Sequence, residues 1–504
     1  MPETPTDSSS PTSPRTSIES TADKDAFGEA FSALPKEIWA AIYDIHTQLT
    51  TALRDPSTRI IDQSNLATLS HLRASSTPTQ NPQPLSSVLT QAQKIFSLRS
   101  VVNHPRFLAY IPLPVSPVSF LGDVLTSCFN VFAGSREAAA GVCAIEDALI
   151  AWLAEQVGFP TSAGGLFVSG GSMANLTALA LAREKMLPMG NANRSKGIVY
   201  ITDQTHFCIV KALKILGFDV QRQVRVIACD DNFRMDVVDL ERAIIQDTND
   251  RLTPFLIIAT CGTTNTGAVD PLHAIADVAK NYRLWLHVDG SFGASAALSG
   301  SHRSLVAGLG RADSLAWDAH KWLFQTYGCG VVLVGERAHL RESFAEEVEF
   351  LDEGREEDSW KYGIELSRPA RHMRLWVSLK VLGTETVGRM IDRGVELGEI
   401  AARMVEGMKG WEVVEKPGMA ILNMRYVGTG TSHWSKRELE MINKGVPGKL
   451  MERNVAFVGT ACLRGKVGVR LCVINPLTTE EDLRVVLEGM DKAAHEIEAS
   501  IIND

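Results

Sequence analysis

The sequence lacks the features that mark several common protein classes. Its 504 residues contain no apolar run long enough to cross a bilayer and no secretory hydrophobic stretch near the start. The eight cysteines are scattered without a Cys-X-X-Cys pair, which argues against structural zinc and a disulfide scaffold. The net charge of −9 argues against nucleic-acid and anionic-membrane partners, because both favour a basic face. We therefore expect a cytoplasmic globular protein with free thiols and no metal site.

Two nucleotide-binding motifs are also absent. The sequence has no Walker lysine and no Gly-X-Gly-X-X-Gly, so neither a nucleoside triphosphate nor a dinucleotide is favoured as ligand. Apolar residues make up 45% and charged residues 22% of the chain, which is the balance of a globular protein with a large core. The length allows more than one domain.

Local patterns predict an α/β protein with four segments. Residues 1–25 are rich in Ser, Thr and Pro and poor in large apolar side chains, so we expect a disordered tail. Residues 26–105 should form an N-terminal helical segment, 106–385 a large cofactor-binding domain and 386–504 a small C-terminal α/β domain. From about residue 140, short apolar runs alternate with helical stretches, which is typical of a mostly parallel sheet covered on both faces.

Individual elements are predicted from these runs. The expected strands are 165–170, 197–202, 224–229, 254–261, 284–289 and 330–335 in the large domain and 411–415, 420–427 and 467–475 in the small one. The expected helices include 37–49, 173–185, 271–282 and 479–498, and residues 75–85 form a linker.

Candidate site residues follow the predicted strands, where ligands bind in an open parallel sheet. Gly171 and Ser172 open a helix after the first strand, which suits an anion but is also a common turn. Asp289 follows an apolar strand and His206 precedes an amphipathic helix; taken alone, each is more often a structural residue. Lys321 lies in the apolar stretch DSLAWDAHKWLFQ, where it is either structural or an amine whose pKa burial lowers.

Together these features match the needs of one cofactor. Pyridoxal 5′-phosphate (PLP) requires an anion site for its phosphate, a platform for its ring, a carboxylate for its pyridine nitrogen and an amine for a Schiff base. The glycine turn, the histidine, the aspartate and the lysine of lowered pKa would each follow a different strand of one sheet. The set therefore predicts a PLP site.

Several segments also carry a family resemblance. DSLAWDAHKWL is similar to a cofactor-lysine segment, FVSGGSMANLTALALAR to a phosphate segment, and ATCGTTNTGAVDPL with LWLHVDG to Thr and Asp strands. HPRFLAYIPLPVSPVSFLGD resembles a substrate-side segment. The family is that of the group II PLP-dependent amino-acid decarboxylases, and the resemblance extends from about residue 95 to the end. It implies PLP fold type I, an amino-acid substrate, and a homodimer with active sites at the interface.

The resemblance also implies a role for each candidate residue. Lys321 would form the aldimine, Asp289 would pair with the pyridine nitrogen, and His206 would stack on the ring and handle a proton. Gly171, Ser172 and His320 would hold the phosphate, Thr264 would lie near the cofactor or the substrate carboxylate, and Tyr110 and Ile111 would line the substrate side chain. The apolar character of this last stretch favours an aromatic or bulky L-amino acid, which would lose CO₂ to give an amine.

Two departures from the family pattern leave alternatives open. Gly290 and Ser291 stand where the family often has two alanines. Phe350 aligns with a loop tyrosine that protonates the α-carbon, and Tyr362 is a second candidate for that place. A phenylalanine cannot donate a proton, so an oxygen-dependent aldehyde synthase on the same scaffold is an alternative function. A catalytically silent relative is a further alternative, disfavoured by the intact lysine, aspartate and histidine.

Overall fold

The computed structural model describes residues 36–53, 55, 57–61, 66–191, 193–346, 358–429 and 434–503. The tail expected at 1–25 and the residue Phe350 lie outside these ranges, so both stay predictions. The chain divides into two compact units, 1–58 and 59–504. In the first unit, helix α2 (Lys36–Ala52) confirms the helix expected at 37–49. The second unit contains two sheets, and the finer domain limits expected from the sequence stay a prediction.

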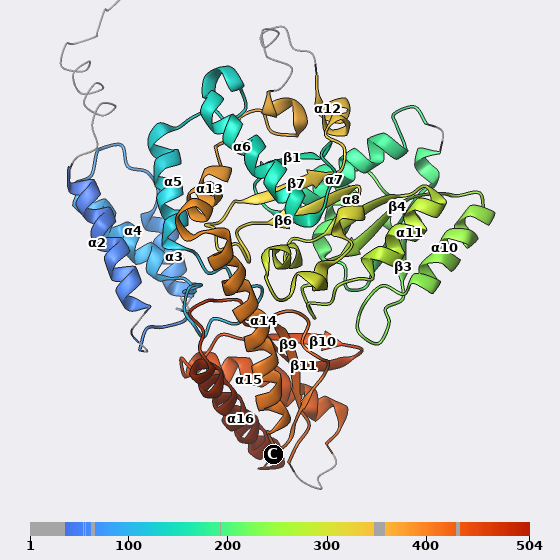
Figure 1. Ribbon diagram of the computed structural model, residues 1–504. Helices are drawn as coiled ribbons and strands as arrows, with labels where there is room; N and C mark the ends of the chain where they lie inside the picture. The colour runs from blue at the N-terminus through green and yellow to red at the C-terminus, as the bar shows by residue number, and fades with distance from the viewer. Residues whose placement is uncertain are drawn as a thin grey trace, which may run out of the picture. The chain divides into compact units, whose positions relative to one another are not determined.

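The larger sheet has seven strands in the order β1-β7-β6-β5-β4-β2-β3 (Figure 1). β7 is antiparallel to both of its neighbours, and the other neighbouring strands run parallel. The strands are β1 (Gly164–Val168), β2 (Gly197–Thr202), β3 (Val224–Ile227), β4 (Thr253–Thr260), β5 (Trp285–Asp289), β6 (Ser314–Asp318) and β7 (Gly330–Val334). The mostly parallel α/β sheet is thus confirmed, and β6 is an additional strand.

Helices cover both faces of this sheet because the strand side chains alternate between two apolar clusters. In β2, Ile198 and Tyr200 join one cluster, whereas Val199 and Ile201 join the other. One face packs against α7 (Gly171–Met186), α8 (Phe207–Ile215) and α12 (Ala338–Phe344), and the other against α6 (Arg136–Val157), α10 (Val237–Asn249) and α11 (Leu272–Tyr282). Burial on both faces explains the continuous apolar runs in the sequence.

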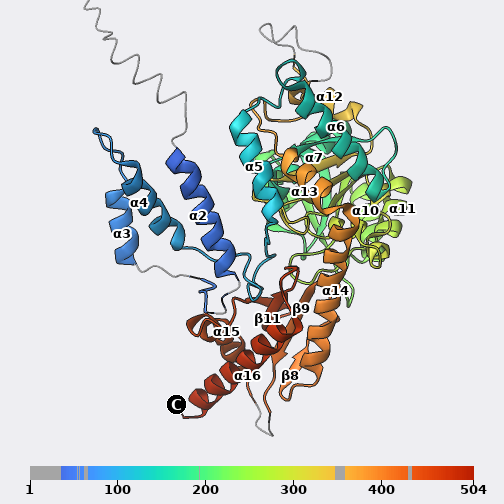
Figure 2. The same ribbon diagram turned by 60° about the vertical axis from the view of Figure 1, so that its left-hand side comes forward.

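The smaller sheet has four antiparallel strands in the order β10-β11-β9-β8. They are β8 (Trp411–Val413), β9 (Ile421–Tyr426), β10 (Gly459–Leu463) and β11 (Lys466–Cys472), and α15 (Lys436–Glu452) and α16 (Glu480–Asn503) accompany them. Helix α14 (Thr384–Glu406) runs from the large sheet to the small one (Figures 1 and 2). A Cβ at Gly388 would lie 2.5 Å from the Leu298 carbonyl oxygen, so a glycine at this position lets α14 approach the turn that ends at Leu298.

The remaining elements connect these layers. The other helices are α3 (Leu66–Ser75), α4 (Leu85–Ser97), α5 (Pro117–Phe129), α9 (Val220–Gln223) and α13 (His372–Leu382), with 3-10 turns at Arg194–Lys196, Gly293–Leu298, Arg303–Val306, Leu309–Arg311 and Ser359–Tyr362. The linker expected near 75–85 lies between α3 and α4. No helix within the described ranges is long and apolar enough to cross a membrane.

A buried ion pair fixes the first strand of the large sheet. The side chains of Arg368 and Glu146 are 1% and 4% exposed, and their closest nitrogen and oxygen atoms are 2.5 Å apart. Burial would raise the pKa of Glu146, but the Arg368 guanidinium outweighs this and keeps it below its usual value. Arg368 also donates to the Phe167 carbonyl of β1 at 2.8 Å. Removing one partner of such a buried ion pair lowers the free energy of unfolding by about 3–5 kcal/mol. This contact therefore holds β1 and the turn after it in place.

Candidate active site

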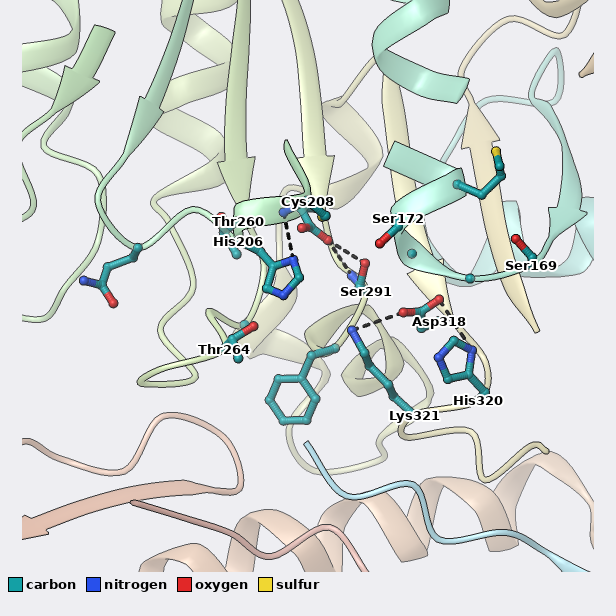
Figure 3. A pocket seen from close by; sticks show the side chains of 17 residues that line it. Ser169, Ser172, His206, Cys208, Thr260, Thr264, Ser291, Asp318, His320 and Lys321 are labelled. Atoms are coloured by element: carbon teal, nitrogen blue, oxygen red, sulfur yellow. Dashed lines mark hydrogen bonds and ion pairs between the residues drawn. The ribbon is translucent and has the colours of Figure 1, made fainter. Parts of the chain in front are cut away.

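A cavity of about 360 Å³ lies at the carboxyl ends of the strands of the large sheet (Figure 3). Seven of the predicted site residues line this cavity: Gly171, Ser172, His206, Thr264, Asp289, His320 and Lys321. Ser169, Gly170, Met173, Gln204, Cys208, Thr260, Gly262, Ser291, Phe292 and Asp318 complete the lining. The sheet topology therefore brings together predicted site residues, such as Gly171 and Lys321, that lie far apart in the chain.

The turn between β1 and α7 forms an anion site. Gly170 has a φ of +149°, a conformation that favours glycine. A Cβ at Gly171 would lie 2.6 Å from both the Asp318 Oδ2 and the Ser291 Oγ, so no larger residue fits there. The first turn of α7 has no side-chain cap, and its free N–H groups and positive dipole end favour a bound phosphate. Ser172 lies exposed to the cavity beside this turn.

His206 enters the cavity as a neutral imidazole. It occupies the N-cap position of α8, and its Nδ1 accepts a hydrogen bond from the Cys208 backbone N–H at 3.4 Å. Burial is the largest influence on this imidazole and lowers its pKa below the usual value. Because Nδ1 is the acceptor, the neutral ring carries its proton on Nε2.

Asp289 ends β5 and is 6% exposed. Its Oδ1 accepts hydrogen bonds from the Ser291 backbone N–H at 3.1 Å and from the Ser291 hydroxyl at 2.6 Å. Among the described residues, no hydrogen bond reaches its Oδ2. The carboxylate is therefore held by one oxygen, and the other is available to a ligand in the cavity.

Lys321 is paired with a carboxylate that the sequence analysis did not single out. Its Nζ lies 3.1 Å from Asp318 Oδ2, and its side chain is 22% exposed. Burial would lower the pKa of Lys321, but the charges of Asp318 and Asp289 outweigh burial and raise it above the usual value. The prediction that burial lowers the pKa of Lys321 is thus wrong for the protein without a bound cofactor. The neighbouring carboxylate of Asp318 stabilises the ammonium and raises the pKa instead.

His320 and Thr264 lie on opposite sides of Lys321 in Figure 3. The His320 Nδ1 donates to the Cys329 carbonyl at 3.1 Å, and burial lowers the pKa of this imidazole. Thr264 lines the cavity after β4, and its backbone carbonyl accepts a hydrogen bond from Arg470 at 2.5 Å. Both predicted residues are therefore positioned by contacts to a neighbouring segment.

Tyr110 and Ile111 do not line this cavity. Ile111 is buried in the main apolar cluster, whereas Tyr110 is 68% exposed with a φ of +54°. The Tyr110 carbonyl accepts a hydrogen bond from Arg470 at 2.5 Å, so it shares this guanidinium with the carbonyl of Thr264. One arginine thus ties the stretch of Tyr110 to the cavity wall, and the role of Tyr110 and Ile111 toward a substrate stays a prediction.

Sequence reasoning missed two charged residues of this region, although each left a signal. Asp318 follows the apolar run SLAW of β6, as Asp289 follows the run of β5, and it is 2% exposed. Arg470 interrupts the buried run VGVRLCV of β11 and is 5% exposed. A charge inside an apolar strand is costly unless it has a partner, so both positions indicated a contact elsewhere in the fold.

The lining residues fit PLP. The glycine turn and the end of α7 suit the phosphate, the open Oδ2 of Asp289 suits a protonated ring nitrogen, and Lys321 supplies a primary amine. Asp318 Oδ1 is buried beside the glycine turn without a hydrogen-bond partner among the described residues, so this part of the cavity is built for a polar ligand.

The comparison with known proteins gives the family and the cofactor. Residues 69–427 match the model of the pyridoxal-dependent decarboxylase conserved domain, so the chain belongs to this family of PLP-dependent decarboxylases. The chain is accordingly a carboxy-lyase that acts on an amino acid with PLP as cofactor.

Named relatives of the family differ in the substrate that their names state. The chain is 39% identical over 430 residues to an aromatic-L-amino-acid decarboxylase of Bacillus atrophaeus, covering 84% of this chain and 88% of the relative. It is 30% identical over 406 residues to an L-2,4-diaminobutyrate decarboxylase of Rhizobium meliloti, covering 79% of each. The crystal structure of Oryza sativa TDC with PLP and tryptamine has the same fold, with a TM-score of 0.86 at 24% identity, covering 92% of this chain and 99% of that one.

Proposed function

We propose that the protein converts an aromatic or bulky L-amino acid to its amine and CO₂. The observation that carries this proposal is the 39% identity to an aromatic-L-amino-acid decarboxylase over most of both chains. The cavity agrees with it, because its lining contains no arginine for an acidic side chain within the described residues. Phe292 contributes an aromatic ring to the lining and stacks on Trp322, with ring centroids 4.8 Å apart.

The proposed mechanism assigns one task to each side chain. The bound cofactor supplies an electron-poor ring that accepts the electron pair left behind when CO₂ departs. Lys321 Nζ would hold the bound cofactor through its amine, and Asp289 Oδ2 would pair with the protonated ring nitrogen. His206 lines the cavity where it would stack on the ring of the bound cofactor, and its Nε2–H would be a proton donor on that side. The glycine turn with Ser172 fixes the phosphate, so the ring is held in one orientation.

A substrate panel tests this proposal. The PLP-loaded protein is incubated with each common L-amino acid, and CO₂, amine, aldehyde and hydrogen peroxide are measured in air-saturated buffer. We expect turnover of phenylalanine, tyrosine or tryptophan with one amine formed per CO₂. Protein treated with borohydride, which fixes the cofactor on the lysine, is the inactive control. Turnover of glutamate or aspartate alone would contradict the aromatic assignment.

The same panel decides between the amine and the aldehyde product. The oxidative alternative depends on the sequence observation that Phe350 stands in EEVEFLDE, where the family pattern has a proton-donating tyrosine. If neither a residue at this position nor His206 delivered a proton to the α-carbon, the carbanion would live long enough to react with oxygen. Equal amounts of aldehyde and peroxide, with little amine, would establish the oxidative function instead of the proposed one.

We also propose that two copies of the chain associate through α5. Leu121, Leu125 and Phe129 recur every four residues on this helix and are 48%, 41% and 75% exposed. An adjacent side of α5 packs on α13, where a Cβ at Gly122 would lie 2.5 Å from the Arg374 Cα. Helix α4 adds further exposed apolar residues and has no buried residue. We propose that a second copy of the chain covers the apolar surface of these two helices.

A charged substitution tests this association. Leu125→Asp should convert a species of twice the chain mass into one of the single-chain mass at micromolar concentration, because a carboxylate in an apolar interface loses its hydration. Light scattering after gel filtration measures the mass. Val238→Asp, at an exposed apolar position on α10, is the matched control and should keep the larger mass. A wild-type chain of single mass would refute the proposal.

We place the protein in the cytosol. The eight cysteines are all free, and five of them are buried. Free thiols are typical of a reducing compartment, where disulfides do not persist.

A further inference from the structure

Ser291 makes three contacts that join the two carboxylates of the cavity. Its backbone N–H and its hydroxyl both donate to Asp289 Oδ1, at 3.1 and 2.6 Å. Its carbonyl accepts from the Asp318 backbone N–H at 3.2 Å. Ser291 is 7% exposed, and in Figure 3 it lies between His206 and Asp318. The residue thus connects the end of β5 to the end of β6.

The hydroxyl of Ser291 has little freedom to move. It lies 2.6 Å from the place that a Cβ on Gly171 would occupy, so the glycine turn packs closely against it. Its donor bond to Asp289 is short and charge-assisted, which makes it stronger than a bond between neutral groups. A carboxylate held by the backbone N–H alone would still rotate about its Cβ–Cγ bond, whereas two donors on one oxygen fix its plane.

We propose that Ser291 is a positioning residue for the cofactor. Its hydroxyl holds Oδ1 of Asp289, so that Oδ2 faces the ring nitrogen and keeps that nitrogen protonated. The inference rests on the proposed role of Asp289 in binding the ring nitrogen. A serine that only stabilised the turn after β5 would affect folding, whereas a positioning serine affects how the cofactor is held.

Cofactor binding to Ser291→Ala distinguishes these two roles. The full chain freed of cofactor is titrated with PLP, and binding is followed by tryptophan fluorescence. We expect a Kd about tenfold higher than that of the wild type, since a charge-assisted hydrogen bond is lost. The absorbance of the bound cofactor should also be titrated with pH. The midpoint of this titration should be higher in the variant than in the wild type, because a less protonated ring would leave the imine nitrogen more basic.

A double-mutant cycle shows whether Ser291 acts through Asp289. In an Asp289→Ala background, Ser291→Ala should change the Kd less than twofold, because the hydroxyl has no carboxylate to hold. Ser295→Ala is the matched control: it removes another buried hydroxyl, which accepts from Trp317 Nε1 at 2.9 Å outside the cavity lining. This variant should keep the wild-type Kd and the wild-type absorbance titration.

Three results would overturn the proposal, and they are distinguishable. An unchanged Kd in Ser291→Ala, or an equal loss in both backgrounds, would show that the hydroxyl does not act through Asp289. A wild-type Kd in Asp289→Ala alone would instead remove the proposed role of Asp289, and the inference with it. If Ser291→Ala fails to fold, Ser291→Cys replaces it, because a thiol has a similar volume and is a weak donor.

Discussion

Replacing Lys321 with alanine is expected to abolish turnover, with a loss on the order of 10⁴-fold or more, because no second amine among the described lining residues can hold the cofactor covalently. The variant should still bind PLP non-covalently, since the glycine turn and Asp289 remain. Its absorbance band should therefore match the free aldehyde form, and borohydride should no longer attach the cofactor to the protein. Activity, spectra and mass after reduction measure these three effects.

Removal of Lys321 also leaves Asp318 without its partner. Asp318 is 2% exposed, so we expect lower thermal stability of the cofactor-free variant in addition to the loss of activity. Lys280→Ala, which removes an exposed lysine in the last turn of α11, is the control and should retain activity and spectrum. Substantial activity of Lys321→Ala, with a covalently attached cofactor after reduction, would assign the attachment to another residue.

Asp289→Asn is expected to lower kcat on the order of 10³-fold, which corresponds to about 4 kcal/mol of lost transition-state stabilisation. The amide has nearly the shape of the carboxylate but carries no negative charge, so it does not keep the ring nitrogen protonated. The substrate KM should change little, because Asp289 acts on the ring and not on the substrate. Steady-state kinetics and the amount of bound PLP are measured together.

A second buried carboxylate supplies the control for this substitution. Asp270 is 4% exposed and accepts from the Met235 and Thr260 backbone N–H groups, at 2.7 Å each, and it does not line the cavity. Burial raises the pKa of Asp270 to about 6. Asp270→Asn should reduce stability while the folded protein keeps its kcat, because each carboxylate oxygen accepts one backbone N–H and the amide can accept only one of the two. If both variants lost activity equally, the effect of Asp289→Asn would be structural.

The sequence predicted most of the strands in the two sheets, but it missed β6 inside the large sheet and β10 at the edge of the small one. Every expected strand has a counterpart, because buried strands leave short continuous apolar runs between helical stretches. β6 and β10 were missed for different reasons. The apolar run of β6 is only LAW, between Ser314 and Asp318, and GTACL of β10 buries alternate residues only partly, so both patterns are weak.

The candidate site shows a similar division. The residues that line the site could be predicted from the sequence, because they follow the strands and the topology alone brings the carboxyl ends of parallel strands together. The hydrogen-bond and ion-pair partners of those residues could not be predicted from the sequence. The pairing of Lys321 with Asp318 and the grip of Ser291 on Asp289 depend on rotamers and on sub-ångström placement, which residue identity does not determine. The expected pKa of Lys321 was wrong for this reason.

The contacts of Arg470 have a consequence for how the chain folds. Its guanidinium reaches the carbonyl of Tyr110, 360 residues earlier, and that of Thr264, 206 residues earlier. Contacts between residues so distant in the chain form late, because the loops that they close cost entropy before any contact is gained. During synthesis at about 5–20 residues per second, the wall of the cavity stays incomplete until β11 has left the ribosome. The contacts by which Arg470 holds Thr264 of the cavity wall are therefore completed late in folding.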